Sequence, residues 1–329
     1  MNPLLWIDGL FAELCGTFSG PLKEEARRLP FTLGLAAEPF TPWSHVFSQE
    51  VTLAAPALVA EAMPELPDEV VREALFAHAL AVIHAMAIDR IEDGQGEPTP
   101  ALGKVLAAAR LRRNALLERV VGGRAGGLDP DTADRELLDA ARQERAILLG
   151  RRRVDFAIYE ALSRRKQSAG MLASSALAAR VGWSPARAAA LRRVLLGAAM
   201  GLQLYDDVID WEDDGAAGRS WAVSLARGRL RGSLSDAPEA NDGGPAVERD
   251  AAEVHAAGVL PRMLERARFH FHATARLAKV LGALRLARWA EERAASLREL
   301  ADREGRSAGY VSRARKLAPW ARAVLDPRA

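Results

Sequence analysis

Long segments rich in alanine and leucine, each ended by glycine or proline, make up most of this 329-residue sequence. No alternating apolar pattern long enough for a β-sheet interrupts them, and their apolar residues recur at helical spacing. Glycine and proline fall between these segments, not at the short, even intervals that separate strands. The sequence therefore predicts an all-α protein. Because no linker separates halves that could fold alone, we expect a single domain over residues 1–329.

The pattern predicts a series of long helices after two or three short ones that precede Pro67. In approximate residue numbers the long helices cover 68–93, 100–121, 131–150, 154–181, 184–215, 251–281 and 283–304. A further short helix is expected near the C-terminus. The segment from 228 to 250 is rich in glycine, serine, proline and charge, which indicates a mobile loop.

Composition narrows the classes of function. With 45 basic and 43 acidic residues, the net charge of +2 provides no overall field that would attract nucleic acid or an anionic membrane. The single cysteine, Cys15, excludes an intramolecular disulfide and a cysteine-cluster zinc site. The N-terminus lacks the basic region of a signal peptide, and the longest apolar window, Ala74–Ile88, is too short for a membrane span. We expect a cytoplasmic protein with no integral membrane segment and no nucleic-acid partner.

The stretch GLQLYDDVIDWEDDG, Gly201–Gly215, places several carboxylates at the end of an apolar helix. Asp206, Asp210 and Asp214 stand at i, i+4 and i+8 on one helix face, and Asp207 stands beside that face. Two such charges ~4 Å apart repel by ~4 kcal/mol at a dielectric constant of about 20. The helix dipole disfavours anions at this end as well. A hard divalent cation such as Mg²⁺ would offset both effects, which predicts a metal site at this helix end. The alternative interpretation is an acidic helix end whose charges are solvated by water.

A second acidic helix end lies at AIDRIEDG, Ala87–Gly94, where Asp89 and Asp93 stand at i, i+4. Glu92 lies between them and is expected to face away. Two such ends predict two walls of one cleft filled by cations. Lys166, which Arg164 and Arg165 adjoin, could bind phosphate as a point charge, and a solvated basic helix face is the alternative.

Together these elements resemble the class I isoprenoid synthase superfamily. The segment LQLYDDVIDW, Leu202–Trp211, resembles the second aspartate-rich motif of trans-isoprenyl diphosphate synthases, with leucine in place of the leading aromatic. Lys166 stands where that family has a diphosphate-binding lysine, and Tyr159 precedes it by seven residues, as in the family. DRIED resembles the aspartate-x-x-x-aspartate motif of squalene and phytoene synthases. The resemblance covers roughly residues 51–220.

The resemblance implies one large helical bundle with a central apolar cavity, acting on a prenyl diphosphate with Mg²⁺. It assigns metal binding to six carboxylates: Asp89, Asp93, Asp206, Asp207, Asp210 and Asp214. Four of these are expected to be essential for catalysis: Asp89, Asp93, Asp206 and Asp210. Lys166 and Arg165 are expected to bind the diphosphate. The allylic carbon–oxygen bond would then ionise, and the carbocation would react in a pocket that excludes water.

Three departures from the elongating synthases bear on the reaction. Ala85 and Met86 follow His84, where those enzymes have two adjacent aspartates. SHVFSQE, Ser44–Glu50, lacks the basic residues that hold isopentenyl diphosphate, and the arginine pair at 112–113 lies well beyond the first acidic motif. A second diphosphate site is therefore expected to be absent, which favours a terpene synthase that cyclises its substrate.

Several alternatives stay open. The chain could be a prenyltransferase, either of the head-to-head squalene or phytoene type or a chain-elongating synthase, or a non-catalytic helical relative that acts as an interaction protein. A homodimer is also open. Arg306 and Tyr310 have the order of the late arginine–tyrosine pair of bacterial cyclases, though a solvated arginine and a packing tyrosine explain them equally well. A carboxylate-bridged di-iron bundle is excluded, since no histidine has a glutamate three residues before it.

Overall fold

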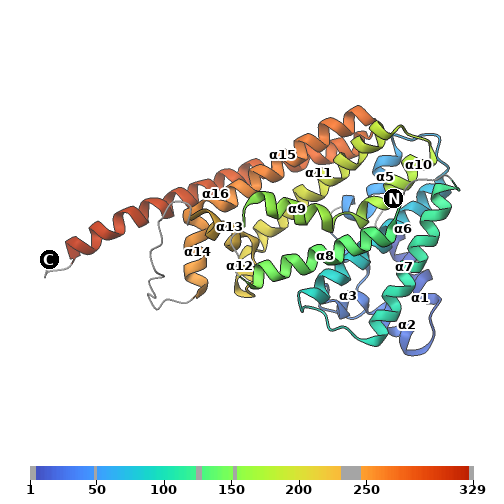
Figure 1. Ribbon diagram of the computed structural model, residues 1–329, viewed down its shortest axis with the longest axis horizontal. Coiled ribbons are helices and arrows are strands. Elements are labelled where there is room, and N and C mark those ends of the chain that lie inside the picture. The colour runs from blue at the N-terminus through green and yellow to red at the C-terminus, as the bar shows by residue number, and fades with distance from the viewer. Residues whose placement is uncertain (1–4, 48–49, 124–127, 151–153, 231–245, 326–329) are drawn as a thin grey trace. The chain divides into compact units, whose positions relative to one another are not determined.

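The computed structural model describes residues 5–47, 50–123, 128–150, 154–230 and 246–325. Within these ranges the chain forms helices and no strand, as Figure 1 shows. The prediction of an all-α protein is confirmed.

Five helices precede the long ones, where two or three were expected. They are α1 (Leu5–Gly16), α2 (Gly20–Arg27), α3 (Leu29–Thr32), α4 (Trp43–Val46) and α5 (Glu50–Ala60). The next three are α6 (Asp68–Glu92), α7 (Pro100–Val121) and α8 (Pro130–Leu149). The bounds of these three agree with the sequence prediction to within one residue at each end.

The ends of α7 illustrate why this part of the prediction succeeds. The Thr99 hydroxyl accepts a hydrogen bond from the Leu102 amide at 3.1 Å, and Pro100 occupies the first helical position. Gly122 ends the helix with φ = 67°, a left-handed conformation that glycine adopts without strain. Both signals are local, so they can be identified in the sequence without knowledge of the tertiary structure.

The helix expected over 154–181 is instead three elements: α9 (Phe156–Lys166), the 3₁₀ turn η1 (Ala169–Met171) and α10 (Leu172–Arg180). The break lies at Ser168, whose hydroxyl donates to the Arg165 carbonyl at 2.8 Å. A serine hydroxyl that binds a nearby carbonyl competes with the helical backbone bond to the same oxygen. As a consequence, Lys166 is the last residue of α9 and does not lie in the middle of a helix.

The helix expected to continue to Gly215 also differs, because α11 (Pro185–Ile209) and α12 (Trp211–Ala216) meet at Asp210. Asp210 has φ = −97° and ψ = 7°, outside helical geometry. Aspartate favours helix boundaries because its short carboxylate competes for backbone hydrogen bonds. The prediction of one helix face through Asp206, Asp210 and Asp214 is therefore corrected to two helices joined at the central aspartate.

Four further helices complete the part of the chain that the structure describes. The segment expected as one helix over 251–281 is α14 (Ala246–Ala257) and α15 (Val259–Leu281), separated by Gly258 at φ = 59°. The expected loop at 228–250 falls mainly on residues 231–245, outside the described residues; its flanks belong to α13 (Trp221–Leu230) and to α14. Finally, α16 (Leu284–Leu325) is one helix where two were expected.

The described chain divides into two compact units. Unit 1 comprises residues 1–143, 162–199 and 273–290, and unit 2 comprises 144–161, 200–272 and 291–329. The single domain expected from the sequence stays a prediction. In unit 1, α6 packs against α5, α7 and α10. By length and composition alone α6 could cross a membrane, but 56% of its apolar window is buried within the structure, as in the core helix of a folded domain.

Unit 2 contains a close packing of α15 against α11. A Cβ atom added at Gly201 would lie 2.6 Å from the ring of Phe271, whose side chain is 1% exposed. Glycine at 201 therefore permits this approach, five residues before the first aspartate of the acidic helix end.

We expect Gly201→Ala to lower the free energy of unfolding by about 1–3 kcal/mol, because the buried Phe271 ring has no space to move into. The measurement is urea denaturation followed by circular dichroism. Gly103→Ala is the matched control on α7, where no atom lies within 4 Å of the added Cβ, and it should gain up to about 1 kcal/mol from helix propensity. Equal stability of the two variants would contradict the close packing at Gly201.

Candidate functional site

The acidic end of α6, in unit 1, is bound by a lysine of α9. The Nζ atom of Lys166 lies 2.7 Å from Oδ1 of Asp89, and the two side chains are 12% and 35% exposed. Asp93 is the residue that follows α6, and its amide donates to the Asp89 carbonyl at 2.9 Å. Two residues expected in one site, one as a metal ligand and one as a diphosphate ligand, thus contact each other directly.

Two arginines extend the positive charge around this helix end. Arg142 of α8 lies 3.2 Å from Glu92, measured from Nε to Oε1, so Glu92 has a basic partner in the protein. Arg165 donates to the side-chain oxygen of Gln143 at 2.9 Å. Arg165 and Lys166 lie in the last turn of α9, where the helix dipole stabilises cations. Sequence reasoning missed Arg142, because nothing in its local sequence distinguishes it from other surface arginines.

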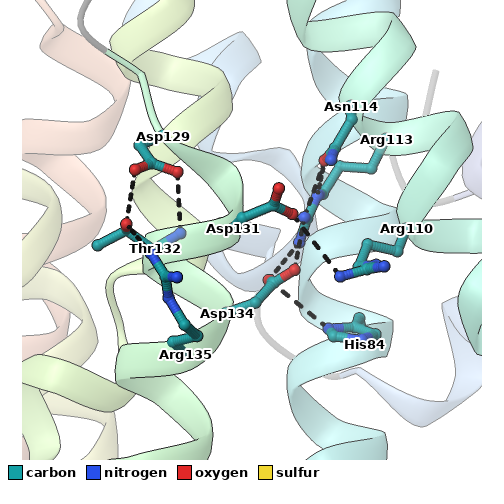
Figure 2. Close-up of polar contacts among 9 residues, drawn as sticks. All are labelled: His84, Arg110, Arg113, Asn114, Asp129, Asp131, Thr132, Asp134 and Arg135. Atoms are coloured by element: carbon teal, nitrogen blue, oxygen red, sulfur yellow. Dashed lines mark hydrogen bonds and ion pairs between the residues drawn. The ribbon is translucent and has the colours of Figure 1, made fainter.

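A buried ion pair joins α7 to α8 in the same unit, as Figure 2 shows. The Arg113 side chain is 0% exposed and donates to both oxygens of Asp134, at 2.6 and 2.8 Å. Asn114 accepts two further bonds from the same guanidinium. His84 of α6 lies 3.8 Å from Asp134, and burial lowers its pKa, which favours the neutral imidazole. Arg113 therefore joins α7 to α8, and its Nε, Nη1 and Nη2 atoms all donate hydrogen bonds within the protein.

The acidic end of α11 lies in unit 2. The backbone bonds from Asp210 to Asp206 and from Asp214 to Asp210, both 2.9 Å, keep the helical repeat across the junction with α12. Asp206 is exposed as a residue, but neighbouring protein partly desolvates its carboxyl, and this effect, followed by the charge on Asp210, raises its pKa to about 6. Burial also raises the pKa of Asp214, although Arg219 at 3.2 Å acts in the opposite direction. The carboxylates here are close enough to repel one another.

Asp207 has a different environment from its neighbours. The Tyr159 hydroxyl donates to its Oδ2 at 2.6 Å, and Gln203 donates to its Oδ1 at 3.0 Å. Tyr159 is fully buried and contacts Trp221 edge to face, with the ring centroids 5.0 Å apart. Both oxygens of Asp207 thus accept bonds from protein donors, so its expected role as a metal ligand stays a prediction.

We expect Tyr159→Phe to lower the free energy of unfolding by about 1.5–3 kcal/mol, because it removes a hydrogen bond to a charged carboxylate and leaves Asp207 partly unsatisfied. Urea denaturation measures the loss. Tyr205→Phe serves as the control, since Tyr205 is only partly buried on the same helix as Asp207. A Tyr159→Phe variant as stable as the Tyr205→Phe variant would show that this bond contributes nothing.

The donors at the two acidic ends suit magnesium. Their side chains offer carboxylate oxygens, the atoms that Mg²⁺ prefers. At Asp89 the Lys166 ammonium stands where a metal cation would bind. Within the described ranges, no three histidine, cysteine or acidic side chains converge closely enough to hold a metal ion. Asp89 and Asp93 belong to unit 1, and Asp206, Asp210 and Asp214 to unit 2. The six expected metal ligands and the two expected diphosphate ligands thus remain predictions about the assembled site.

The other candidate residues in the described chain lie on α12 and α16. Arg306 and Tyr310 both lie on α16, and Arg306 is exposed. Trp211 is buried in unit 2, where its ring contacts His255 edge to face. Sequence reasoning also missed Gln203 as a partner of Asp207, though a glutamine four residues before an aspartate on a helix is a recognisable hydrogen-bonding pair.

Comparison with known proteins bears on the fold. No protein-family model matches the chain, and no curated protein matches it in sequence. The structure is similar to the crystal structure of a polyprenyl synthetase from Streptomyces coelicolor A3(2), with a TM-score of 0.63 and 17% sequence identity. The match covers 88% of this chain and 98% of that one. The chain therefore has an isoprenoid synthase-type fold, as the resemblance of its motifs implied.

Proposed function

We propose that this protein is a Mg²⁺-dependent class I terpene synthase, which ionises an allylic prenyl diphosphate and cyclises the resulting carbocation. The observation that carries the proposal is the contact between Lys166 and Asp89 in a protein of isoprenoid synthase-type fold. It brings an ammonium suited to phosphate next to a carboxylate suited to magnesium. The similar solved structure is named a polyprenyl synthetase, which supports prenyl diphosphates as the class of substrate.

In this proposal the diphosphate binds at the positively charged end of α9. Lys166 neutralises a phosphate oxygen as a point charge, and the Arg165 guanidinium can bind two oxygens at once. Asp89, Asp93, Asp206 and Asp210 hold magnesium ions, which when bound stabilise the charge on the departing diphosphate. The proposal requires the acidic ends of α6 and α11 to serve the same diphosphate.

Residues beyond the carboxylates must then protect the carbocation. A cation formed in the site reacts with water unless the walls are apolar and closed. The buried aromatic residues Phe76 of α6 and Trp211 of α12 are the kind of side chain that such a wall needs. In this proposal they belong to the walls or to the packing directly behind them.

The environment of Arg113 favours cyclisation over chain elongation. An elongating enzyme needs basic residues for a second diphosphate, and the arginine pair after the first acidic motif is the natural place to seek them. Arg113 is fully buried and bound to Asp134. Upstream, Ser44 binds the carboxylate of Asp8 and offers no positive charge. Arg112, the other member of that pair, is exposed on α7, whereas the buried Arg113 is not available to a second diphosphate. The burial of Arg113 and the absence of a positive charge at Ser44 are the reasons to favour cyclisation.

A prenyltransferase is the second candidate. The name of the similar structure favours chain elongation, and the DRIED motif favours head-to-head condensation. The chemistry distinguishes them, because elongation consumes isopentenyl diphosphate, whereas head-to-head condensation joins two allylic diphosphates without it.

The deciding experiment is incubation of the protein with Mg²⁺ and prenyl diphosphates of ten to twenty-five carbons, with and without isopentenyl diphosphate, followed by mass spectrometry. We expect inorganic diphosphate and a cyclic hydrocarbon or alcohol in both conditions. A longer diphosphate formed only with isopentenyl diphosphate would identify an elongating synthase instead. A product that joins two allylic chains would identify a head-to-head enzyme.

A non-catalytic relative would give no product with any substrate. A thermal shift with Mg²⁺ and a non-hydrolysable diphosphate analogue then separates two cases, since a ligand that binds only the folded protein raises the melting temperature, and does so further as its concentration exceeds its Kd. A shift without product would indicate that the substrate lies outside the range tested. No product and no shift would show that the proposed function is wrong.

A further inference from the structure

A proline lies inside the largely buried helix α5. Pro56 is itself buried, and it has no amide hydrogen, so the carbonyl four residues earlier, that of Thr52, has no i→i−4 helical donor. The proline ring also crowds that carbonyl and favours a bend of the helix there. Because a carbonyl left unpaired inside a packed protein costs about as much free energy as a lost hydrogen bond, the Thr52 oxygen needs a donor from another element.

The donor is a histidine of the neighbouring helix α6. Nε2 of His78 lies 2.9 Å from the Thr52 oxygen. A carbonyl oxygen only accepts, so Nε2 carries the proton and donates it. His78 is 4% exposed, and burial lowers its pKa to about 4, although the carbonyls of Thr52 and Gly170 act in the opposite direction. At neutral pH the imidazole is therefore uncharged, with its single ring proton on Nε2.

We propose that His78 replaces the backbone donor that Pro56 removes, and that this bond fixes the rotation of α6 against α5. The match between the two residues is specific. Of the carbonyls in α5, the Thr52 carbonyl is the one that a proline at position 56 deprives of its helical donor, and it is the one that His78 meets. A histidine that only filled space in the core would have no reason to contact this oxygen.

The bond bears on the proposed site because of where Asp89 stands on the same helix. Asp89 follows His78 by eleven residues, which is about three turns, so the two lie within about 20° of one helix face and about 16 Å apart along the axis. Rotation of α6 about its axis would therefore turn Asp89 away from its direction. In this respect His78 is a positioning residue, an assignment that rests on the proposed function.

A double-mutant cycle in urea tests the bond. His78→Phe keeps a ring and removes the donor, and we expect it to raise the equilibrium constant for unfolding on the order of tenfold or more, because the Thr52 carbonyl is left unpaired. Pro56→Ala restores an amide hydrogen at position 56, so this carbonyl regains a helical donor. In the Pro56→Ala background, His78→Phe should raise the constant clearly less. If His78→Phe alone is unfolded by circular dichroism, adding Pro56→Ala should restore the fold.

Pro100→Ala is the matched control. Pro100 occupies the first turn of α7, where an amide hydrogen has no partner within the helix, so its replacement restores no hydrogen bond. In that background His78→Phe should cause its full loss of stability. Equal losses in the wild-type and Pro56→Ala backgrounds would overturn the proposal, and so would a compensation by Pro100→Ala as large as that by Pro56→Ala.

Turnover separates a positioning role from a purely structural one. In Pro56→Ala, His78 keeps its bond, since a carbonyl oxygen can accept from two donors. In Pro56→Ala/His78→Phe the carbonyl is satisfied but the bond between the helices is absent. We expect kcat for a prenyl diphosphate to be on the order of tenfold lower in the double variant than in Pro56→Ala, because small misplacements of reacting groups slow catalysis strongly. Equal kcat values would show that His78 does not position Asp89.

Failure of the proposed function gives a different result. Coupling in the denaturation cycle without turnover by the wild type would support the bond between His78 and Thr52, and would refute both the proposed function and the positioning role. Turnover by the wild type without coupling in the cycle would refute the bond as the replacement for the missing donor, and would leave the proposed function standing.

Discussion

Replacing Asp210 with alanine is expected to lower the turnover of prenyl diphosphate by about a thousandfold or more. Asp210 stands at the junction of α11 and α12 and would share a magnesium ion with Asp206 in the proposed site. A metal that stabilises a departing diphosphate contributes several kcal/mol to the transition state, and each 1.4 kcal/mol is about a factor of ten in rate. Release of inorganic diphosphate, measured at saturating Mg²⁺ and substrate, reports the loss.

Asp89→Ala is expected to lower the turnover of prenyl diphosphate by a similar factor, because in the proposed site both acidic helix ends bind the same diphosphate. Asp213→Ala is the matched control, because the substitution removes the same negative charge. Asp213 is exposed on α12 and lies outside the repeat of Asp206, Asp210 and Asp214. It should retain most of the activity. If Asp89→Ala and Asp210→Ala both kept wild-type turnover, the assignment of the site would be wrong.

Replacing Arg113 with leucine is expected to destabilise the protein by about 3–5 kcal/mol. The variant leaves the Asp134 carboxylate buried without its bidentate partner, and an uncompensated buried charge is costly. His84 at 3.8 Å cannot fully replace the guanidinium, since burial lowers the pKa of this histidine and disfavours its charged form. The midpoint of urea denaturation, followed by circular dichroism, measures the effect.

Two further variants show whether the cost comes from the unpaired charge. Arg110→Leu breaks the exposed pair between Arg110 and Asp131 on the same two helices, and should cost less than about 1 kcal/mol. The double variant Arg113→Leu/Asp134→Leu removes both charges and should recover much of the lost stability. An Arg113→Leu variant as stable as Arg110→Leu would contradict the structural role of the buried pair.

The sequence predicts helices accurately where their ends carry local signals and poorly where they do not. α7 is bounded by Thr99, Pro100 and Gly122, and its predicted and observed bounds coincide. The breaks at Ser168 and Asp210 occur inside segments that were each expected to be one continuous helix. These breaks depend on single polar side chains that compete for backbone hydrogen bonds. The apolar periodicity of a long segment carries no information about such competition.

The same contrast holds for the site. The spacing of the aspartates and the position of Lys166 in its motif sufficed to select these residues as candidates. The contact of Lys166 with Asp89 was not predicted, because it depends on the packing of α9 against α6, which sequence spacing does not determine. Arg142 was missed for a similar reason, since its relation to Glu92 depends on the course of α8. Residue type and spacing can be read from one sequence, whereas pairing between distant helices cannot.

The junction at Asp210 changes which carboxylates the helix dipole disfavours. In one continuous helix, every acidic residue from Asp206 to Asp214 would face the negative pole of the same dipole. Two helices reverse that field halfway: Glu212, Asp213 and Asp214 occupy the first turn of α12, where the backbone amides attract anions. The opposing field remains only for the carboxylates that precede the junction. Six acidic side chains can therefore lie within nine residues of the chain while the backbone dipole opposes fewer than half of them.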